Sequence, residues 1–189
     1  MNLPNRLTLI RIALSFLLVF LLLLPGLAFK GAALCVFAAA ALTDWWDGRI
    51  ARRRGLTSDF GALMDPIADK VLVLSAFGAF VLLHVVPLWM VLLIAARELL
   101  ITGLRIIALV KGKVLPAEAA GKWKAAFQMT VIAVTLLFLV AREAAPPSGP
   151  GWMSPGETWI RMLMLWVVLL TLASGISFLW HHRKLILGS

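Results

Sequence analysis

Long apolar segments recur along this chain, and they constrain its fold more than any other feature. Hydrophobic residues make up 62% of the 189 residues, against about 45–50% in an average soluble domain. The mean hydropathy is +0.98. A helix of about 20 apolar residues crosses a bilayer, and apolar surface in this excess needs lipid as its solvent. The pattern therefore predicts an all-α, polytopic membrane protein.

Six apolar segments are separated by short polar or Pro/Gly-rich connections. The last connection, EAAPPSGPGWMSPGE at 143–157, is expected to be a loop because proline and glycine interrupt helices. Little chain remains for a soluble domain, so we predict one membrane domain over residues 1–189. The six predicted transmembrane helices run from Leu7 to Leu24, Gly31 to Arg54, Phe60 to His84, Leu88 to Lys111, Glu118 to Arg142 and Thr158 to Trp180.

The net charge is +9, and its distribution predicts the orientation. Lys and Arg concentrate in the cytoplasmic loops of membrane proteins and attract anionic lipid, so the basic balance does not indicate nucleic acid as a partner. One set of helix ends carries Arg6, Arg11, Arg49, Arg52, Arg53, Arg54, Lys111, Lys113, Lys122, Lys124, Arg183 and Lys184. The opposite set carries Lys30, Arg142 and Arg161. Six spans then place both termini in the cytoplasm, and length and layout are typical of a bacterial inner-membrane protein.

Five of the nine acidic residues lie within residues 41–70. Asp44 and Asp47 are three apart, and Asp65 and Asp69 are four apart, so each pair shares one face of a helix. A short loop makes the two helices antiparallel, and the pairs can face each other. One aspartate in mid-bilayer costs about 2.5–3.5 kcal/mol on insertion scales. Two divalent cations would balance four carboxylates, and such a pair of ions can clamp the oxygens of a phosphoryl transfer.

Glycines and an arginine follow the same helix faces. Gly48 lies four residues after Asp44, and Gly61 lies four residues before Asp65. Glycine lets a ligand or another backbone approach closely. Arg52 follows Gly48 by one turn, and its planar, positively charged guanidinium group can form two parallel hydrogen bonds to a phosphate.

The complete pattern is Asp44-x-x-Asp47-Gly48-x-x-Ala51-Arg52, eight residues, then Gly61-x-x-x-Asp65-x-x-x-Asp69. It resembles the full signature of the CDP-alcohol phosphatidyltransferases, with eight specified residues over 26 positions. The segments NLPNRLTLIRI, ARELLITGLRIIALVKGKVLPA and AAGKWKAAFQMTVIA are similar to the branch of that family that uses sn-glycerol 3-phosphate.

The resemblance implies an enzyme that transfers the phosphatidyl group of CDP-diacylglycerol to sn-glycerol 3-phosphate by metal-assisted in-line attack, with CMP leaving. The cofactor implied is Mg²⁺ or Mn²⁺, with two ions per active site, and Asp69 would also be the catalytic base. A homodimer in the membrane, with its active site facing the cytoplasm, is the implied assembly. The implied metal ligands are Asp44, Asp47, Asp65 and Asp69. The implied CDP-binding residues are Asp44, Gly48, Arg52 and Gly61.

The phosphate of the acceptor also needs cationic partners. The candidates are Arg97, Arg105, Lys122 and Lys124. Other interpretations stay open, because Glu98 lies seven residues before Arg105 and could form a salt bridge with it. Lys122 and Lys124 could serve topology alone. Lys70, next to Asp69, fits a snorkelling or counter-ion residue better than a ligand.

Two alternative functions remain open. One is the same reaction class with another acceptor, as in cardiolipin, phosphatidylserine or phosphatidylinositol-phosphate synthases. The other is an ion or proton transporter, since carboxylates inside membranes also serve relays. The carboxylates cluster at one membrane face instead of forming a chain across it, which disfavours a transporter. Release of CMP that requires both CDP-diacylglycerol and a divalent metal would separate these classes.

Overall fold

The computed structural model describes residues 3–54, 59–110, 119–146 and 151–187, and these residues contain helices and no strands. For residues 3–8, 44–54, 59–67, 69, 119–120, 122 and 184–187 it describes the course of the helix but not the surroundings of the side chains. The helices are α1 (Leu3–Leu23), α2 (Leu27–Arg54), α3 (Asp59–Leu82), α4 (Leu88–Val110), α5 (Ala119–Ala144) and α6 (Met153–Leu187).

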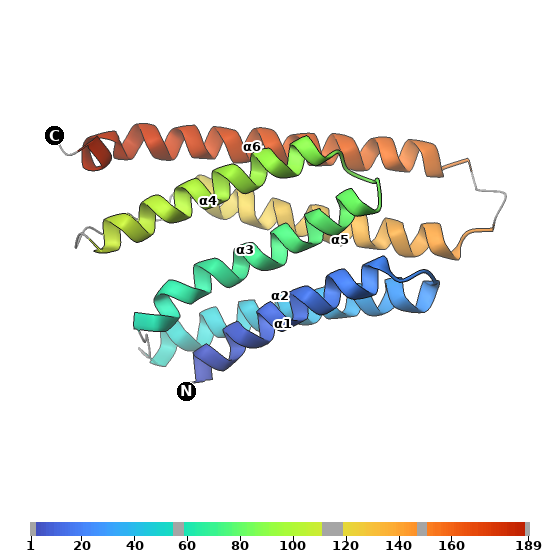
Figure 1. Cartoon of the computed structure of the whole chain (residues 1–189), viewed down its shortest axis with the longest axis horizontal. Coiled ribbons are helices and arrows are strands. Elements are labelled where there is room, and N and C mark those ends of the chain that lie inside the picture. Colours follow the sequence, from blue (N-terminus) through green and yellow to red (C-terminus); the bar gives the residue numbers. More distant parts are fainter. Residues whose placement is uncertain (1–2, 55–58, 111–118, 147–150, 188–189) are drawn as a thin grey trace.

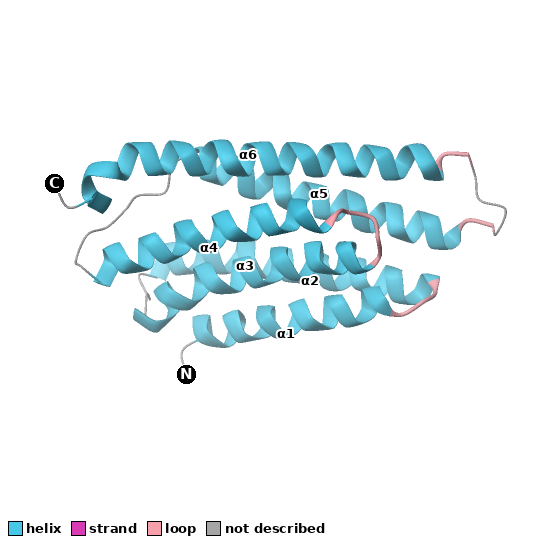
Figure 2. Cartoon of the chain, turned by 45° about the horizontal axis from the view of Figure 1, so that its top comes forward, coloured by secondary structure: helices cyan, strands magenta, loops and turns pink. Residues whose placement is uncertain are grey.

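The helices run antiparallel along one common direction (Figures 1 and 2). One end of the bundle holds both chain termini, the last turns of α2 and α4, and the first turns of α3 and α5 (Figure 1). We call it the motif end, because the residues from Asp44 to Asp69 lie toward it. The opposite end, where α1, α3 and α5 finish, is called the turn end. Six antiparallel helices bring both termini to one end.

The apolar core fills the half of the bundle nearer the turn end. α1 packs against α2 and α3, α4 packs against α3 and α6, and α5 contacts α2, α3 and α6. The rings of Phe77 and Phe80 lie 6.4 Å apart at the centre of this core. Other fully buried core side chains are Leu18, Leu22, Ile94, Ile132, Leu136, Leu139 and Met164.

The turn end is closed by polar contacts between α1, α2 and α5. Gly26 has a φ of 113°, a conformation that glycine adopts readily. Its backbone N–H donates a hydrogen bond to Glu143 Oε1 at 2.6 Å. Lys30 Nζ donates to the carbonyl oxygens of Leu22 and Leu24. These carbonyls end α1 and lack partners within the helix, so Lys30 satisfies them.

The predicted helix boundaries agree well with the structure for the first five helices, but the loop prediction for 143–157 is wrong at both ends. α5 continues to Ala144 and α6 begins at Met153. Pro155 lies in the first turn of α6, where its missing N–H would have had no partner within the helix. Gly156 packs against Phe138, and a Cβ at this glycine would lie 2.4 Å from the Phe138 ring. Glycine thus allows α6 to approach α5 closely.

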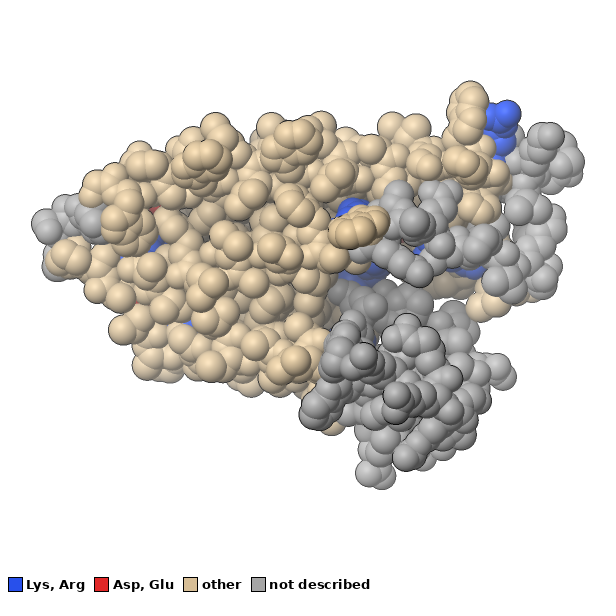
Figure 3. All heavy atoms as spheres, turned by 180° about the vertical axis from the view of Figure 1, so that it is seen from behind, with Lys and Arg blue, Asp and Glu red and all other residues tan. Residues whose placement is uncertain are grey.

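Within the part of the chain that the structure describes, two helical stretches are long and apolar enough to cross a membrane. They are Trp123–Ala144 and Met153–Arg183, with mean hydropathies of 1.9 and 2.2. Large apolar side chains such as Phe16, Leu99 and Ile176 point outward and are exposed. Figure 3 shows one face with few charged atoms along the helices, and most of its visible Lys and Arg atoms gather toward the motif end. This surface suits a lipid environment.

Candidate active site

The aspartate motif lies on the parts of α2 and α3 nearer the motif end. Asp44 and Asp47 are on α2, and Asp65 and Asp69 are on α3. Both segments are helical through the motif, which is what the shared-face argument requires. The two helices are antiparallel and both pack against α1 (Figure 1). The side chains of the motif residues and of Lys122 lie outside the described ones, so their contacts stay predictions.

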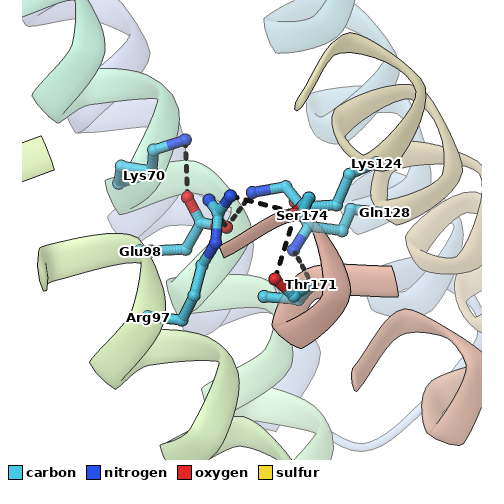
Figure 4. Close-up of polar contacts among 7 residues, drawn as sticks. All are labelled: Lys70, Arg97, Glu98, Lys124, Gln128, Thr171 and Ser174. Carbon is cyan, nitrogen blue, oxygen red and sulfur yellow. Dashed lines mark hydrogen bonds and ion pairs between the residues drawn. The ribbon is translucent and has the colours of Figure 1, made fainter. Parts of the chain in front are cut away.

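A buried carboxylate links three cationic side chains next to this region (Figure 4). Glu98 on α4 is 1% exposed. Its Oε2 lies 2.8 Å from Lys70 Nζ on α3. Its Oε1 accepts a hydrogen bond from Lys124 Nζ on α5 and lies 3.4 Å from Arg97 Nη1. One carboxylate therefore connects α3, α4 and α5 through charged contacts. We call these four residues the Glu98 cluster.

Arg97 extends the Glu98 cluster to α6. Its Nη2 donates a hydrogen bond to Ser174 Oγ at 2.9 Å, and Ser174 Oγ donates to the Thr171 carbonyl at 3.0 Å. Gly175 makes room for this arginine, since a Cβ there would lie 3.0 Å from Arg97 Cγ. Gln128 on α5 contacts the Thr171 hydroxyl at 3.5 Å. The guanidinium is thus fixed by contacts on two helices.

A cavity of about 100 Å³ borders the Glu98 cluster. Its polar lining includes Arg11, Lys70, Glu98 and Gln128. Arg11 on α1 is 3% exposed. A second, more open pocket of about 370 Å³ lies between α3 and α4 and is also lined by Lys70. Lys70 thus lines both cavities.

Arg105 lies apart from the Glu98 cluster. Its guanidinium carbon is 5.2 Å from the centre of the Phe178 ring on α6, and Phe178 in turn stacks on His182 with 4.5 Å between ring centres. The Arg105 Nε is buried and has no hydrogen-bond partner among the described residues. The salt bridge considered between Glu98 and Arg105 is not formed. Seven helical residues separate their Cα atoms by about 10.5 Å along the axis, and Glu98 pairs with nearer cations.

The structure brings two of the four predicted acceptor residues together. Arg97 and Lys124 meet at Glu98, and Lys70 is a counter-ion, as expected, with Glu98 as its partner. Sequence reasoning considered Glu98 only as a partner of Arg105, and it assigned no site role to Arg11. Both residues are charged and lie within apolar helices. Such residues need buried partners, and this position in the sequence is the signal that could have identified them.

Comparisons with known proteins agree with the motif. The CDP-alcohol phosphatidyltransferase family model matches residues 1–180. The chain is 38% identical over 148 residues to the CDP-diacylglycerol–glycerol-3-phosphate 3-phosphatidyltransferase of Bacillus subtilis, covering 72% of this chain and 77% of that protein. It is 34% identical over 193 residues to the protein of that name from Pseudomonas fluorescens, covering 97% of this chain and 93% of that protein. It is 35% identical over 180 residues to a probable phosphatidylglycerophosphate synthase of Mycobacterium tuberculosis, covering 94% of this chain and 79% of that protein. The chain belongs to the CDP-alcohol phosphatidyltransferase family.

Proposed function

We propose that this chain transfers the phosphatidyl group of CDP-diacylglycerol to sn-glycerol 3-phosphate, giving phosphatidylglycerophosphate and CMP. The observation that carries the proposal is the position of the Glu98 cluster beside the aspartate motif, with Lys70 directly after Asp69 on α3. A cationic group next to a carboxylate motif suits an acceptor that carries its own phosphate. The names of the similar proteins support this choice of acceptor.

We place all six helices across a bacterial inner membrane as one domain over residues 1–189, with both termini and the motif end on the cytoplasmic side. Trp159 and Trp180 are 67% and 68% exposed on α6. Their separation of 21 residues corresponds to about 31 Å of helix, close to the thickness of the hydrocarbon core. Tryptophan favours both membrane interfaces, which supports this placement. We also expect a homodimer, which light scattering of the detergent-solubilised protein would test.

The metal site is assigned to the four motif aspartates. Their chemistry fits Mg²⁺ or Mn²⁺, because these ions bind hard oxygen donors and two divalent cations balance four carboxylates. The helical course of α2 and α3 through the motif supports the fit, since each pair then shares one helix face. When bound, the ions would offset the negative charge that develops at the transferring phosphate. The residues that would hold the two ions are Asp44, Asp47, Asp65 and Asp69.

The chemical step joins the two substrates at one phosphorus atom. The hydroxyl oxygen of sn-glycerol 3-phosphate bonds to the phosphorus that carries diacylglycerol, and the bond from that phosphorus to the CMP oxygen breaks. Asp69 accepts the hydroxyl proton as general base. Asp44, Gly48, Arg52 and Gly61 line the CDP site, where the glycines admit the ligand and Arg52 pairs with phosphate.

Four cations are assigned to the phosphate of the acceptor. Arg97 and Lys124 are supported by their meeting at Glu98 (Figure 4), and Glu98 lines the cavity of about 100 Å³. Arg105 is supported by a buried Nε that has no hydrogen-bond partner among the described residues. Lys122 precedes Lys124 on α5 and extends the same cationic region along the sequence.

The test is a screen of acceptor alcohols with labelled CDP-diacylglycerol and the purified protein in detergent. We expect phosphatidylglycerophosphate from sn-glycerol 3-phosphate, with CMP release that requires Mg²⁺ or Mn²⁺. Product from phosphatidylglycerol, serine or inositol phosphate instead would assign another acceptor. Ion flux in liposomes without CMP release would favour a transporter and contradict the proposal.

A further inference from the structure

Glu98 lies among more positive charge than it can balance. It is paired with Lys70, Lys124 and Arg97, which come from three helices. The two lysines alone bring two positive charges to one carboxylate, which leaves one positive charge in excess among the described contacts of Glu98, Lys70 and Lys124. Replacing a buried ion pair by well-packed apolar residues is often neutral or stabilising. The excess positive charge of the Glu98 cluster therefore indicates a role other than stabilising the folded protein.

The two lysines of the cluster keep hydrogen-bonding capacity for another anion. A lysine ammonium has three N–H donors. Among the described contacts, Lys124 donates one hydrogen bond to Glu98 Oε1, and Lys70 forms an ion pair with Glu98 Oε2. The polar residues Lys70, Glu98 and Gln128 line part of the cavity of about 100 Å³. An anionic group that reaches this cavity would meet Lys70, and Lys124 lies on the other oxygen of the same Glu98 carboxylate.

We propose that Glu98 is a positioning residue for acceptor binding, which holds Lys70, Lys124 and Arg97 as one unit with the charge and geometry to bind a dianionic phosphate. The inference rests on the proposed function and deepens it, since it adds Lys70 to the acceptor site and explains how the cations are oriented. Glu98 itself does not touch the substrate. Its two oxygens point to different helices, so it sets the spacing between Lys70 on α3 and Lys124 on α5.

The same contacts fit a simpler role, in which Glu98 only ties the helices together. Loss of a structural tie weakens the folded state and affects the binding of both substrates. Loss of a positioning residue affects the substrate whose ligands it orients. The KM values for the two substrates therefore separate the two roles.

The test is Glu98→Gln in the full-length protein, which removes the charge and keeps the shape. We expect the KM for sn-glycerol 3-phosphate to rise about 10–100-fold, the effect of losing one charge-assisted contact, with little change in the KM for CDP-diacylglycerol. Glu157→Gln is the matched control. Glu157 lies 3.4 Å from Arg142 and 4.0 Å from Arg161 at the turn end, so its loss should leave both KM values unchanged.

A second measurement does not depend on turnover. Inorganic phosphate and sn-glycerol 3-phosphate should each raise the melting temperature of the wild-type protein, and Glu98→Gln should need a higher concentration of either for the same rise. If Glu98→Gln does not fold, Glu98→Asp keeps the charge on a shorter side chain and should show a smaller, still selective, rise in the acceptor KM.

Three outcomes overturn the inference: equal changes in both KM values, no change in either, or a lower acceptor KM. The last would mean that Glu98 competes with the phosphate instead of orienting its ligands. Failure of the proposed function is distinguishable, because the wild-type protein would then show no transfer to sn-glycerol 3-phosphate. The melting measurements with inorganic phosphate would still decide the role of Glu98.

Discussion

The carboxylate of Glu98 and the ammonium of Lys70 lie 2.8 Å apart, although Glu98 is on α4 and Lys70 is on α3. Lys70 directly follows Asp69 in the chain. The packing of α4 on α3 thus couples the Glu98 cluster to the helix that carries two of the four motif aspartates. A shift of either helix would change the distance between the proposed acceptor site and the proposed metal site.

The motif aspartates are expected to be essential for activity but not for folding. Asp47→Asn and Asp65→Asn each remove one negative charge from a set of four that two divalent cations would balance, which leaves three carboxylates for the two ions. We expect each variant to elute from size exclusion as the wild-type protein does and to lose its activity. Residual turnover above about a tenth of the wild-type rate at saturating metal would contradict the two-metal site.

Asp69 is expected to act mainly in the chemical step. In Asp69→Asn three carboxylates remain to hold metal, while the group that accepts the hydroxyl proton is gone. We expect CDP-diacylglycerol to bind nearly as in the wild-type protein and kcat to fall about 10²–10⁴-fold. Equilibrium binding of labelled donor and single-turnover rates measure the two effects separately. Loss of donor binding together with normal turnover of the bound fraction would identify Asp69 as a metal ligand alone.

Arg105 and Lys122 are expected to bind the acceptor. A charge-assisted contact contributes roughly 1.5–3 kcal/mol, which is about ten- to a hundredfold in affinity. Arg105→Ala and Lys122→Ala should each raise the KM for sn-glycerol 3-phosphate and leave that for CDP-diacylglycerol nearly unchanged. Arg161→Ala at the turn end, where Arg161 pairs with Glu157, is the control and should change neither. Steady-state kinetics with each substrate varied in turn would show whether the effect is selective.

Gly175 is expected to be needed for the position of Arg97. In Gly175→Ala the new Cβ would lie 3.0 Å from Arg97 Cγ and 3.1 Å from its Nε, so the arginine must shift by a few tenths of an ångström, which would disturb its hydrogen bond to Ser174. We expect a higher KM for sn-glycerol 3-phosphate, even though alanine favours a helix by about 1 kcal/mol over glycine.

The matched control for this change is Gly103→Ala on α4. A Cβ at Gly103 would meet no atom within 4 Å, so this variant should keep wild-type KM values and an equal or higher melting temperature. If Gly175→Ala also behaves as the wild-type protein does, Arg97 tolerates displacement and its contact with Ser174 is not needed for binding.

The sequence by itself determined the helical class, the approximate extent of the helices and the composition of the motif. Apolar segments of 18 to 25 residues predict helices locally, because each helix satisfies its own backbone hydrogen bonds. Residues three or four apart, such as Asp44 and Asp47, share a face in any helix that contains them. The motif spacing therefore indicated the family without knowledge of how the helices pack.

Only the tertiary structure decided which charges meet. Glu98 was considered as a partner of Arg105 on its own helix, yet its partners include Lys70 on α3 and Lys124 on α5. Helix periodicity places residues on a face, but it does not tell which neighbouring helix covers that face. The start of α6 also depends on packing. Glycine at position 156 disfavours a helix locally, but here it lets α6 pack closely against Phe138 on α5, and that contact is not visible in the local sequence. Contacts between distant segments depend on packing, and packing is a property of the whole bundle that no local pattern contains.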